Sequence, residues 1–171
     1  QNIVAWAENL EWNWPDGKRA QWNKHYWKKG TPLPGVSISK AITDTFLHQE
    51  KYSIGCYTAT QLVMIHGVLD YYKRIKKSPA DLAEIERRLM AHDNDPLVQI
   101  EPRAVWAFEE DFDANELWQK GKLLEMRYNI PARNFVPGDW GYLLNTDPIT
   151  AKKIGYEGSN VIYLGRGKFD D

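Results

Sequence analysis

The residue best suited to covalent chemistry is Cys56, the single cysteine of this 171-residue chain. It lies within Tyr52–Gln61, where an extended approach gives way to a helix. Gly55 permits a sharp turn directly before it, and apolar residues recur at helical spacing from Leu62 to Tyr72. Unpaired N–H groups and the positive end of the helix dipole favour a thiolate there and can stabilise an oxyanion. The pattern predicts a nucleophilic cysteine, and the alternative is a small buried hydrophobe.

Several elements must position this cysteine. We expect a helix from Cys56 to about Lys76, and a second one that begins at Ser78-Pro79, where Ser78 is the N-cap. Further helices are predicted over Asn2 to Leu10, over Trp22 to Lys29, and from Ser37 or Ser39 to Leu47. Strands are predicted within Phe135–Asn145, at Gly158–Gly165 and, more weakly, at Leu97–Ile100, whereas Glu116 to Arg127 fits a helix or a strand. Helices followed by strands predict an α+β domain.

Composition excludes several classes of partner. The length fits one domain over residues 1–171, and 22 basic residues against 23 acidic ones give no basic surface for nucleic acid. No apolar run is long enough for a membrane span. The four histidines lack the spacing of zinc ligands, and the acidic run Glu109–Asp113 has no accompanying histidine. We therefore expect neither a metal nor an organic cofactor.

Short stretches in a common order resemble one family of enzymes. They are Asn2–Ala5, Ser39–Ile42, the Cys56-x-Thr58-Ala59 run, Gly138-Asp139-x-x-Tyr142, and Asn160–Gly165. Together they resemble the bacterial spore-coat protein-glutamine γ-glutamyltransferase, a compact transglutaminase on the papain-like and NlpC-like plan. The resemblance implies an α+β fold with the catalytic cysteine at the N-terminus of a central helix packed on a small antiparallel sheet.

The resemblance also assigns site residues, and this chain departs from them twice. The family's nucleophile falls on Cys56, but its partner acid falls on Ser159 and the acid before its cysteine falls on Gly55. Glu157, two residues before Ser159, is the replacement base that we expect, with Asp139 and Asp147 as other carboxylates in this half. Ser159 can hold a water molecule or orient the substrate, or it is an inactivating substitution. A family histidine would fall just beyond Asp171.

The reaction that the resemblance implies is calcium-independent acyl transfer. Cys56 forms a thioester with a protein glutamine, and a lysine amine then completes an isopeptide crosslink, or water completes a deamidation. Tyr57, Asp139 and Trp140 are the expected substrate-binding residues, although plain core packing explains the two aromatic rings equally well. The partners are proteins that carry glutamine and lysine, and the compartment is cytoplasmic, spore-coat or that of a delivered effector. The alternatives are an NlpC-like amidase or peptidase, and an impaired binding or toxin domain.

Overall fold

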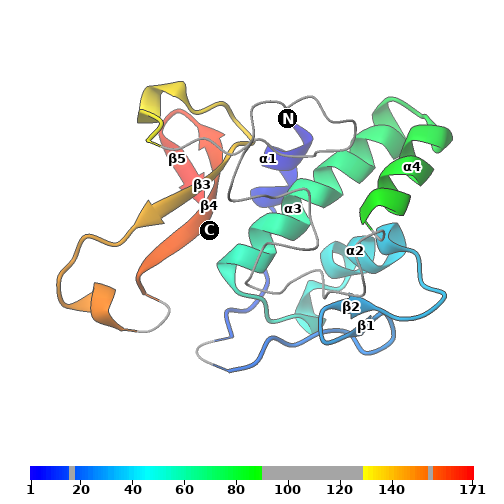
Figure 1. The fold of residues 1–171 in the computed structure, drawn as a ribbon, viewed down its shortest axis with the longest axis horizontal. Helices are drawn as coiled ribbons and strands as arrows, with labels where there is room; N and C mark the ends of the chain where they lie inside the picture. Colours follow the sequence, from blue (N-terminus) through cyan, green and yellow to red (C-terminus); the bar gives the residue numbers. More distant parts are fainter. Residues whose placement is uncertain (16–17, 90–128, 154–155) are drawn as a thin grey trace.

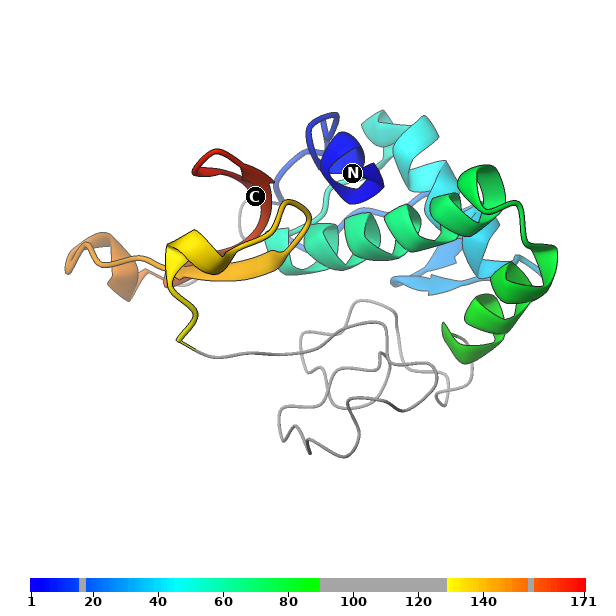
Figure 2. The same cartoon turned by 90° about the horizontal axis from the view of Figure 1, so that it is seen from above.

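The computed structural model describes residues 1–15, 18–89, 129–153 and 156–171. Short elements from both ends of the chain surround one central helix, α3 (Cys56–Asp70) (Figure 1). The antiparallel sheet lies toward one end of α3, and helix α4 (Pro79–Leu89) lies toward the other, as two perpendicular views show (Figure 2). The predicted α+β class is confirmed.

Helix α3 is buried on nearly all sides, because the short helix α1 (Asn2–Ala7), helix α2 (Ile38–Leu47) and strand β4 (Gly158–Gly165) all pack against it. A helix in such a position needs apolar residues around its whole circumference, and eleven of its fifteen residues are buried. It continues into one π-helical turn, η2 (Tyr71–Ile75), so that the helical segment ends beside the predicted Lys76.

The C-terminal sheet has three antiparallel strands in the order β3-β4-β5, with β3 at Trp140–Leu144 and β5 at Lys168–Asp170. Trp140 pairs with Ile162 and Tyr142 pairs with Asn160. The predicted strands at both sites are confirmed. Because alternate residues of a strand face opposite sides, the burial of Ile162 in the core identifies the sheet face that meets the helices.

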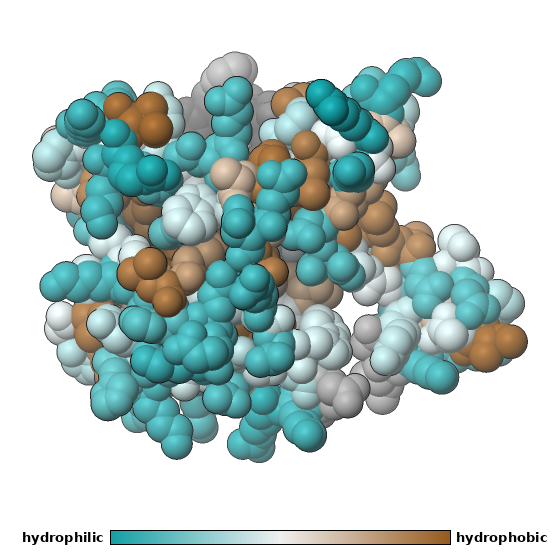
Figure 3. All heavy atoms as spheres, turned by 180° about the vertical axis from the view of Figure 1, so that it is seen from behind, coloured by the Kyte–Doolittle hydropathy of each residue, from teal (hydrophilic) through white to brown (hydrophobic). Residues whose placement is uncertain are grey.

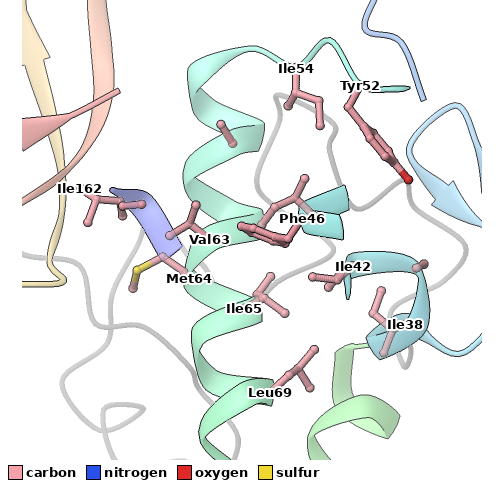
Figure 4. Packing of buried hydrophobic residues seen from close by; sticks show 14 of the residues in the cluster. Ile38, Ile42, Phe46, Tyr52, Ile54, Val63, Met64, Ile65, Leu69 and Ile162 are labelled. Atoms are coloured by element: carbon pink, nitrogen blue, oxygen red, sulfur yellow. The ribbon is translucent and has the colours of Figure 1, made fainter. Parts of the chain in front are cut away.

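The core fills the space between α2, α3 and the sheet (Figure 4). Its labelled members come from α2, from the approach to α3, from α3 itself and from β4: Ile38, Ile42, Phe46, Tyr52, Ile54, Val63, Met64, Ile65, Leu69 and Ile162. Two predicted helix starts are confirmed. Ser37 accepts a hydrogen bond from Lys40 N at the start of α2, and Ser78 accepts one from Asp81 N at the start of α4.

The predicted helix over Trp22 to Lys29 is wrong. Trp27–Lys28 form strand β1, which pairs with β2 at Thr31–Pro32 across a tight turn. Lys29 and Gly30 take left-handed backbone conformations with φ of 51° and 80°, which ends any helix before them. The buried Trp27 instead anchors the hairpin, because its Nε1 donates to the carbonyl of Ala41 on α2 at 3.1 Å.

Three sequence predictions lie outside the described residues: the strand at Leu97–Ile100, the acidic run Glu109–Asp113, and the element at Glu116 to Arg127. Remaining short elements are the 3₁₀ turns η1 (Gln49–Lys51), η4 (Ala132–Asn134) and η5 (Thr150–Lys152). Within the described ranges, no helix has both the length and the apolar character to cross a bilayer. Seen from behind, hydrophilic side chains cover most of the surface (Figure 3).

Candidate active site

Cys56 is the first residue of α3, as the sequence predicted, and its side chain is half-buried. Gly55 is the N-cap residue, with an extended backbone (φ −77°, ψ 158°) and no side chain to occupy the first N–H groups of the helix. The far end of the first turn is closed by Thr60, whose hydroxyl donates to the carbonyl of Cys56 at 2.8 Å. Cys56 thus lies at a helix terminus that no side chain caps.

The segment that leads to Cys56 is held on both sides by the N-terminal part of the chain. Gln21 and Ser53 exchange two backbone hydrogen bonds of 2.8 and 3.1 Å, and the N–H of Ile54 donates to the carbonyl of Asn13 at 3.0 Å. A Cβ atom at Gly55 would lie 3.6 Å from the ring of Trp14, which is 52% exposed. The N-terminal loop therefore fixes the cysteine segment and places an open aromatic ring beside it.

The side chain that approaches the sulfur is Asn160 of strand β4. Its Nδ2 lies 3.8 Å from Cys56 Sγ, and its Oδ1 accepts a hydrogen bond of 3.0 Å from Nε1 of Trp140 on β3. An indole N–H can only donate, so it fixes the amide oxygen toward Trp140 and the NH₂ group toward the sulfur. Residues 104 positions apart in the sequence thereby form one connected site.

Two of the predicted substrate-binding residues lie next to each other. The rings of Tyr57 and Trp140 make an edge contact with centroids 5.4 Å apart. Because Tyr57 follows the cysteine and Trp140 holds Asn160, this aromatic pair flanks the Cys56–Asn160 contact. The predicted aromatic wall has a place in the structure, and its role in binding substrate stays a prediction.

Three of the predicted polar residues lie in strand β4 or directly before strands β3 and β4. The Ser159 hydroxyl donates to the Asp171 carboxylate at 2.8 Å. Asp139 accepts from the backbone N–H of Val136 at 2.8 Å and so stabilises the turn before β3. Glu157 precedes β4 with an exposed side chain. Since Asn160 faces the sulfur, its strand neighbour Ser159 points to the opposite face.

A carboxylate that the sequence reasoning did not consider lies on the same sheet face as Asn160. Asp170 of β5 pairs with Ile162, and side chains of paired residues share a face. Burial raises the pKa of Asp170, and the neighbouring negative charges of Asp171 and Glu8 raise it further. Its partly buried carboxyl group therefore holds a proton to higher pH than an ordinary aspartate does.

His66 and His48 make their described contacts with residues other than Cys56. His66, ten residues after Cys56 on α3, is a core residue stacked on Phe46 with ring centroids 4.2 Å apart. His48, eight residues before the cysteine, is exposed at the end of α2 and lies within 3.8 Å of Asp44 and of Glu50. Among the described residues, no three His, Cys, Asp or Glu side chains group in a way that fits a metal ion.

Comparison with known proteins identifies the family. A family model described as protein-glutamine gamma-glutamyltransferase matches residues 1–170. The chain belongs to that family. Its fold is similar to that of a transglutaminase from Geobacillus stearothermophilus without its C-terminal extension, with a TM-score of 0.61 and 25% sequence identity over 99% of this chain and 70% of that one. A search of curated proteins finds no match.

Membership in this transglutaminase family confirms the resemblance seen in the sequence, together with the papain-like architecture and the assignment as a cysteine acyltransferase. The family acts on protein substrates. Cys56 is the chain's single cysteine and is therefore the candidate nucleophile for this chemistry. Asn160 was missed as a site residue, although its alternation with Ile162 in the predicted strand would have placed it on the core-facing side.

Proposed function

We propose that the chain crosslinks proteins, through a thioester on Cys56, by joining a glutamine side chain to a lysine amine without calcium. The observation that carries this proposal is the placement of Cys56 Sγ at the start of α3, 3.8 Å from the amide of Asn160. Family membership over residues 1–170 supports the reaction class. The proposal adds to this reaction class the role of Cys56 as nucleophile and of a lysine amine as the acyl acceptor.

In the first half-reaction the Cys56 thiolate attacks the γ-carbonyl carbon of a glutamine side chain. A carbon–sulfur bond forms, and the carbonyl electrons move to oxygen, where the N–H groups at the start of α3 stabilise the negative charge. As the carbonyl re-forms, the carbon–nitrogen bond breaks and the nitrogen takes up a proton to leave as ammonia. The product is a γ-glutamyl thioester on Cys56.

In the second half-reaction a lysine amine attacks the thioester carbon. A carbon–nitrogen bond forms, the nitrogen loses a proton, and the carbon–sulfur bond breaks to regenerate the thiolate. Water in place of the amine gives glutamate, so the site must favour an alkyl amine over water. The adjacent rings of Tyr57 and Trp140 would line such a path, with Asp139 holding the turn that carries Trp140.

Both half-reactions need a group that gives and takes protons. Glu157 is the first candidate, since it is an exposed carboxylate that directly precedes the strand carrying Asn160. Ser159 lies on the strand face opposite the sulfur, so its part in orienting water or substrate would be indirect, through the Asp171 carboxylate to which it bonds. Asp170 is the second candidate, because it lies on the sheet face of Asn160 and its pKa is raised.

The test is incorporation of a labelled primary amine into a glutamine-bearing protein, with ammonia release measured in parallel. We expect the wild-type chain to incorporate amine at the same rate with and without a calcium chelator, and Cys56→Ala to abolish both signals. Glu157→Gln should lower the rate by about 100-fold if that residue transfers the proton. A matched variant, Asp170→Asn, tests the second candidate in the same assay.

Other outcomes would contradict parts of the proposal. Ammonia release without incorporation would show that the chain deamidates glutamine. Retention of activity in Cys56→Ala would exclude the thioester. If wild type gives neither signal, while Cys56 reacts with iodoacetamide no faster than free cysteine does, the alternative of an impaired domain in which Ser159 inactivates the site is favoured.

A further inference from the structure

We propose that Asn160 is a catalytic residue whose side-chain NH₂ donates first to the Cys56 thiolate and then to the oxyanion, and that Trp140 positions it. This inference rests on the proposed thioester chemistry. It assigns a role to a side chain that belongs to a quoted family stretch, Asn160–Gly165, but to which the sequence reasoning gave no role. It depends on two contacts: Asn160 Nδ2 to Cys56 Sγ at 3.8 Å and Trp140 Nε1 to Asn160 Oδ1 at 3.0 Å.

The chemistry of the three groups fixes the direction of both contacts. The Trp140 indole has one N–H and no acceptor, so it can bond only to the amide oxygen of Asn160. The amide must then present its two N–H donors toward Cys56. A sulfur atom is a weak acceptor as a thiol, whereas as a thiolate it accepts a charge-assisted hydrogen bond. The Asn160 amide therefore interacts more strongly with the charged, nucleophilic form.

The same donor is well placed for the next state of the reaction. When sulfur bonds to the γ-carbonyl carbon, it loses its charge, and the charge appears on an oxygen one bond further along. An amide that contacts the sulfur has a second N–H with which to reach that oxygen, beside the N–H groups at the start of α3. Asn160 thus stabilises the negative charge on the sulfur of the thiolate and then on the oxygen of the tetrahedral intermediate.

Rigid surroundings hold the amide in this orientation. Asn160 lies on the central strand β4 and pairs with Tyr142 of β3, and Ile162, two residues further along β4, is buried in the core. Trp140 pairs with Ile162 in the adjacent strand, and its ring is in edge contact with Tyr57. The orienting hydrogen bond therefore comes from a side chain that is itself fixed by the sheet and by the helix of the nucleophile.

The roles of donor and positioning residue can be separated by experiment. The variants are Asn160→Ala, Asn160→Leu and Trp140→Phe in the full chain, each checked for a cooperative thermal transition. Matched controls are Asn145→Ala, which removes an amide elsewhere in the same hairpin, and Trp12→Phe, which removes an indole N–H donated to the carbonyl of Thr45. The readouts are kcat and KM for amine incorporation and the pH profile of Cys56 alkylation by iodoacetamide.

We expect both Asn160 variants to lose about 100-fold or more in kcat with a much smaller change in KM. Their alkylation profile should move to higher pH, because iodoacetamide forms no oxyanion and reports the thiolate alone. Trp140→Phe should shift the same profile in the same direction with a loss of about 5- to 10-fold in kcat, the size of one hydrogen bond. The two controls should keep the wild-type profile.

The inference is overturned if a folded Asn160→Ala keeps kcat within about threefold of wild type and an unshifted alkylation profile. It is also overturned if the control variants move the profile as far as the Asn160 variants do. The role of Trp140 alone is excluded if Trp140→Phe leaves the profile unchanged. Alkylation needs no acyl transfer, so it also separates this inference from the proposed function. If wild type incorporates no amine but the Asn160 variants still shift the alkylation profile relative to wild type, the Asn160–Cys56 contact is supported and the proposed function is rejected.

Discussion

At the scale of single residues, His66 shows how the core makes the chain sensitive to acid. Neither ring nitrogen has a hydrogen-bond partner, and the ring lies between Phe46 and Trp6, with centroid distances of 4.2 and 4.3 Å. Burial lowers the pKa of His66 from 6.5 to about 4, because a charged imidazolium would lose its hydration there. The neutral form is therefore the one that fits the fold.

This predicts a loss of stability between pH 6.5 and pH 4. In that window the unfolded chain binds a proton at His66 and the folded chain does not, so the free energy of unfolding falls as the pH falls. The full effect is about 3 kcal/mol at roughly 1.4 kcal/mol per pH unit. Urea unfolding of wild type and His66→Leu from pH 4 to pH 8 measures it. His48→Leu, at an exposed site, is the control, and an equal pH slope in wild type and His66→Leu would contradict the prediction.

The sequence identified Cys56 and its helix from local signals, a glycine and an apolar period that begins beside the cysteine. It did not identify Asn160 as the side chain that meets the sulfur. That contact joins residues 104 positions apart, and it depends on which strand face turns toward α3. Reasoning from the family position drew attention to Ser159, whose hydroxyl bonds to Asp171 instead.

At the scale of elements, α1 crosses α3 at a glycine. A Cβ atom on Gly67 would lie 2.5 Å from Cγ1 of Ile3 and 3.2 Å from its Cα. The shorter distance is a steric clash that real Cβ atoms essentially never show. The absence of a side chain at Gly67 lets the backbone of α1 approach α3 closely. Helix α1 contacts strand β4 as well as α3, so its position at Gly67 also affects its packing on the sheet.

Gly67→Ala should therefore destabilise the protein, although alanine favours helix over glycine by about 1 kcal/mol. Overpacking typically costs about 1–3 kcal/mol, and here the alanine methyl meets the α1 backbone as well as a side chain. Denaturant unfolding measures the net change. The double variant Gly67→Ala with Ile3→Ala should lose less than the sum of the two single changes, because part of the clash disappears. Additive losses would show that the crossing is not the cause.

Helices were predicted correctly where an N-cap serine marked their start, and incorrectly in a segment of mixed aromatic and polar residues. Ser78 was correctly predicted as the start of α4, and of the two serines offered for the start of α2, Ser37 or Ser39, the structure uses Ser37. The segment Trp22 to Lys29 was predicted as a helix, but it contains a two-residue strand whose turn needs left-handed residues at Lys29 and Gly30. The conformation of that segment depends on Trp27, whose indole N–H bonds to Ala41 on α2. A local sequence pattern does not predict such a long-range contact.

At the scale of the whole molecule, the site depends on three segments that are distant in sequence. The N-terminal loop pairs with the approach to Cys56, α3 carries the cysteine, and the C-terminal sheet supplies Asn160. A buried carboxylate joins two of these segments to α2. Asp44 accepts hydrogen bonds from Asn23 of the N-terminal loop at 2.7 Å and from the hydroxyl of Tyr52 in the approach. Both side chains that donate these hydrogen bonds to Asp44 lie outside α2.

This linkage predicts that Tyr52→Phe lowers the free energy of unfolding by about 1–3 kcal/mol at pH 7, because a buried carboxylate loses a donor. The deficit should shrink above pH 10. Burial and the nearby Asp44 raise the pKa of Tyr52 above its ordinary value, so in alkali the unfolded wild-type chain loses this proton while the folded chain keeps it. Wild type then loses stability that Tyr52→Phe no longer has. Urea unfolding at pH 7 and pH 11 measures both arms, with Tyr142→Phe at a 54% exposed site as the control. A deficit that is constant with pH would show that the Tyr52 hydroxyl is not held as a neutral donor to Asp44.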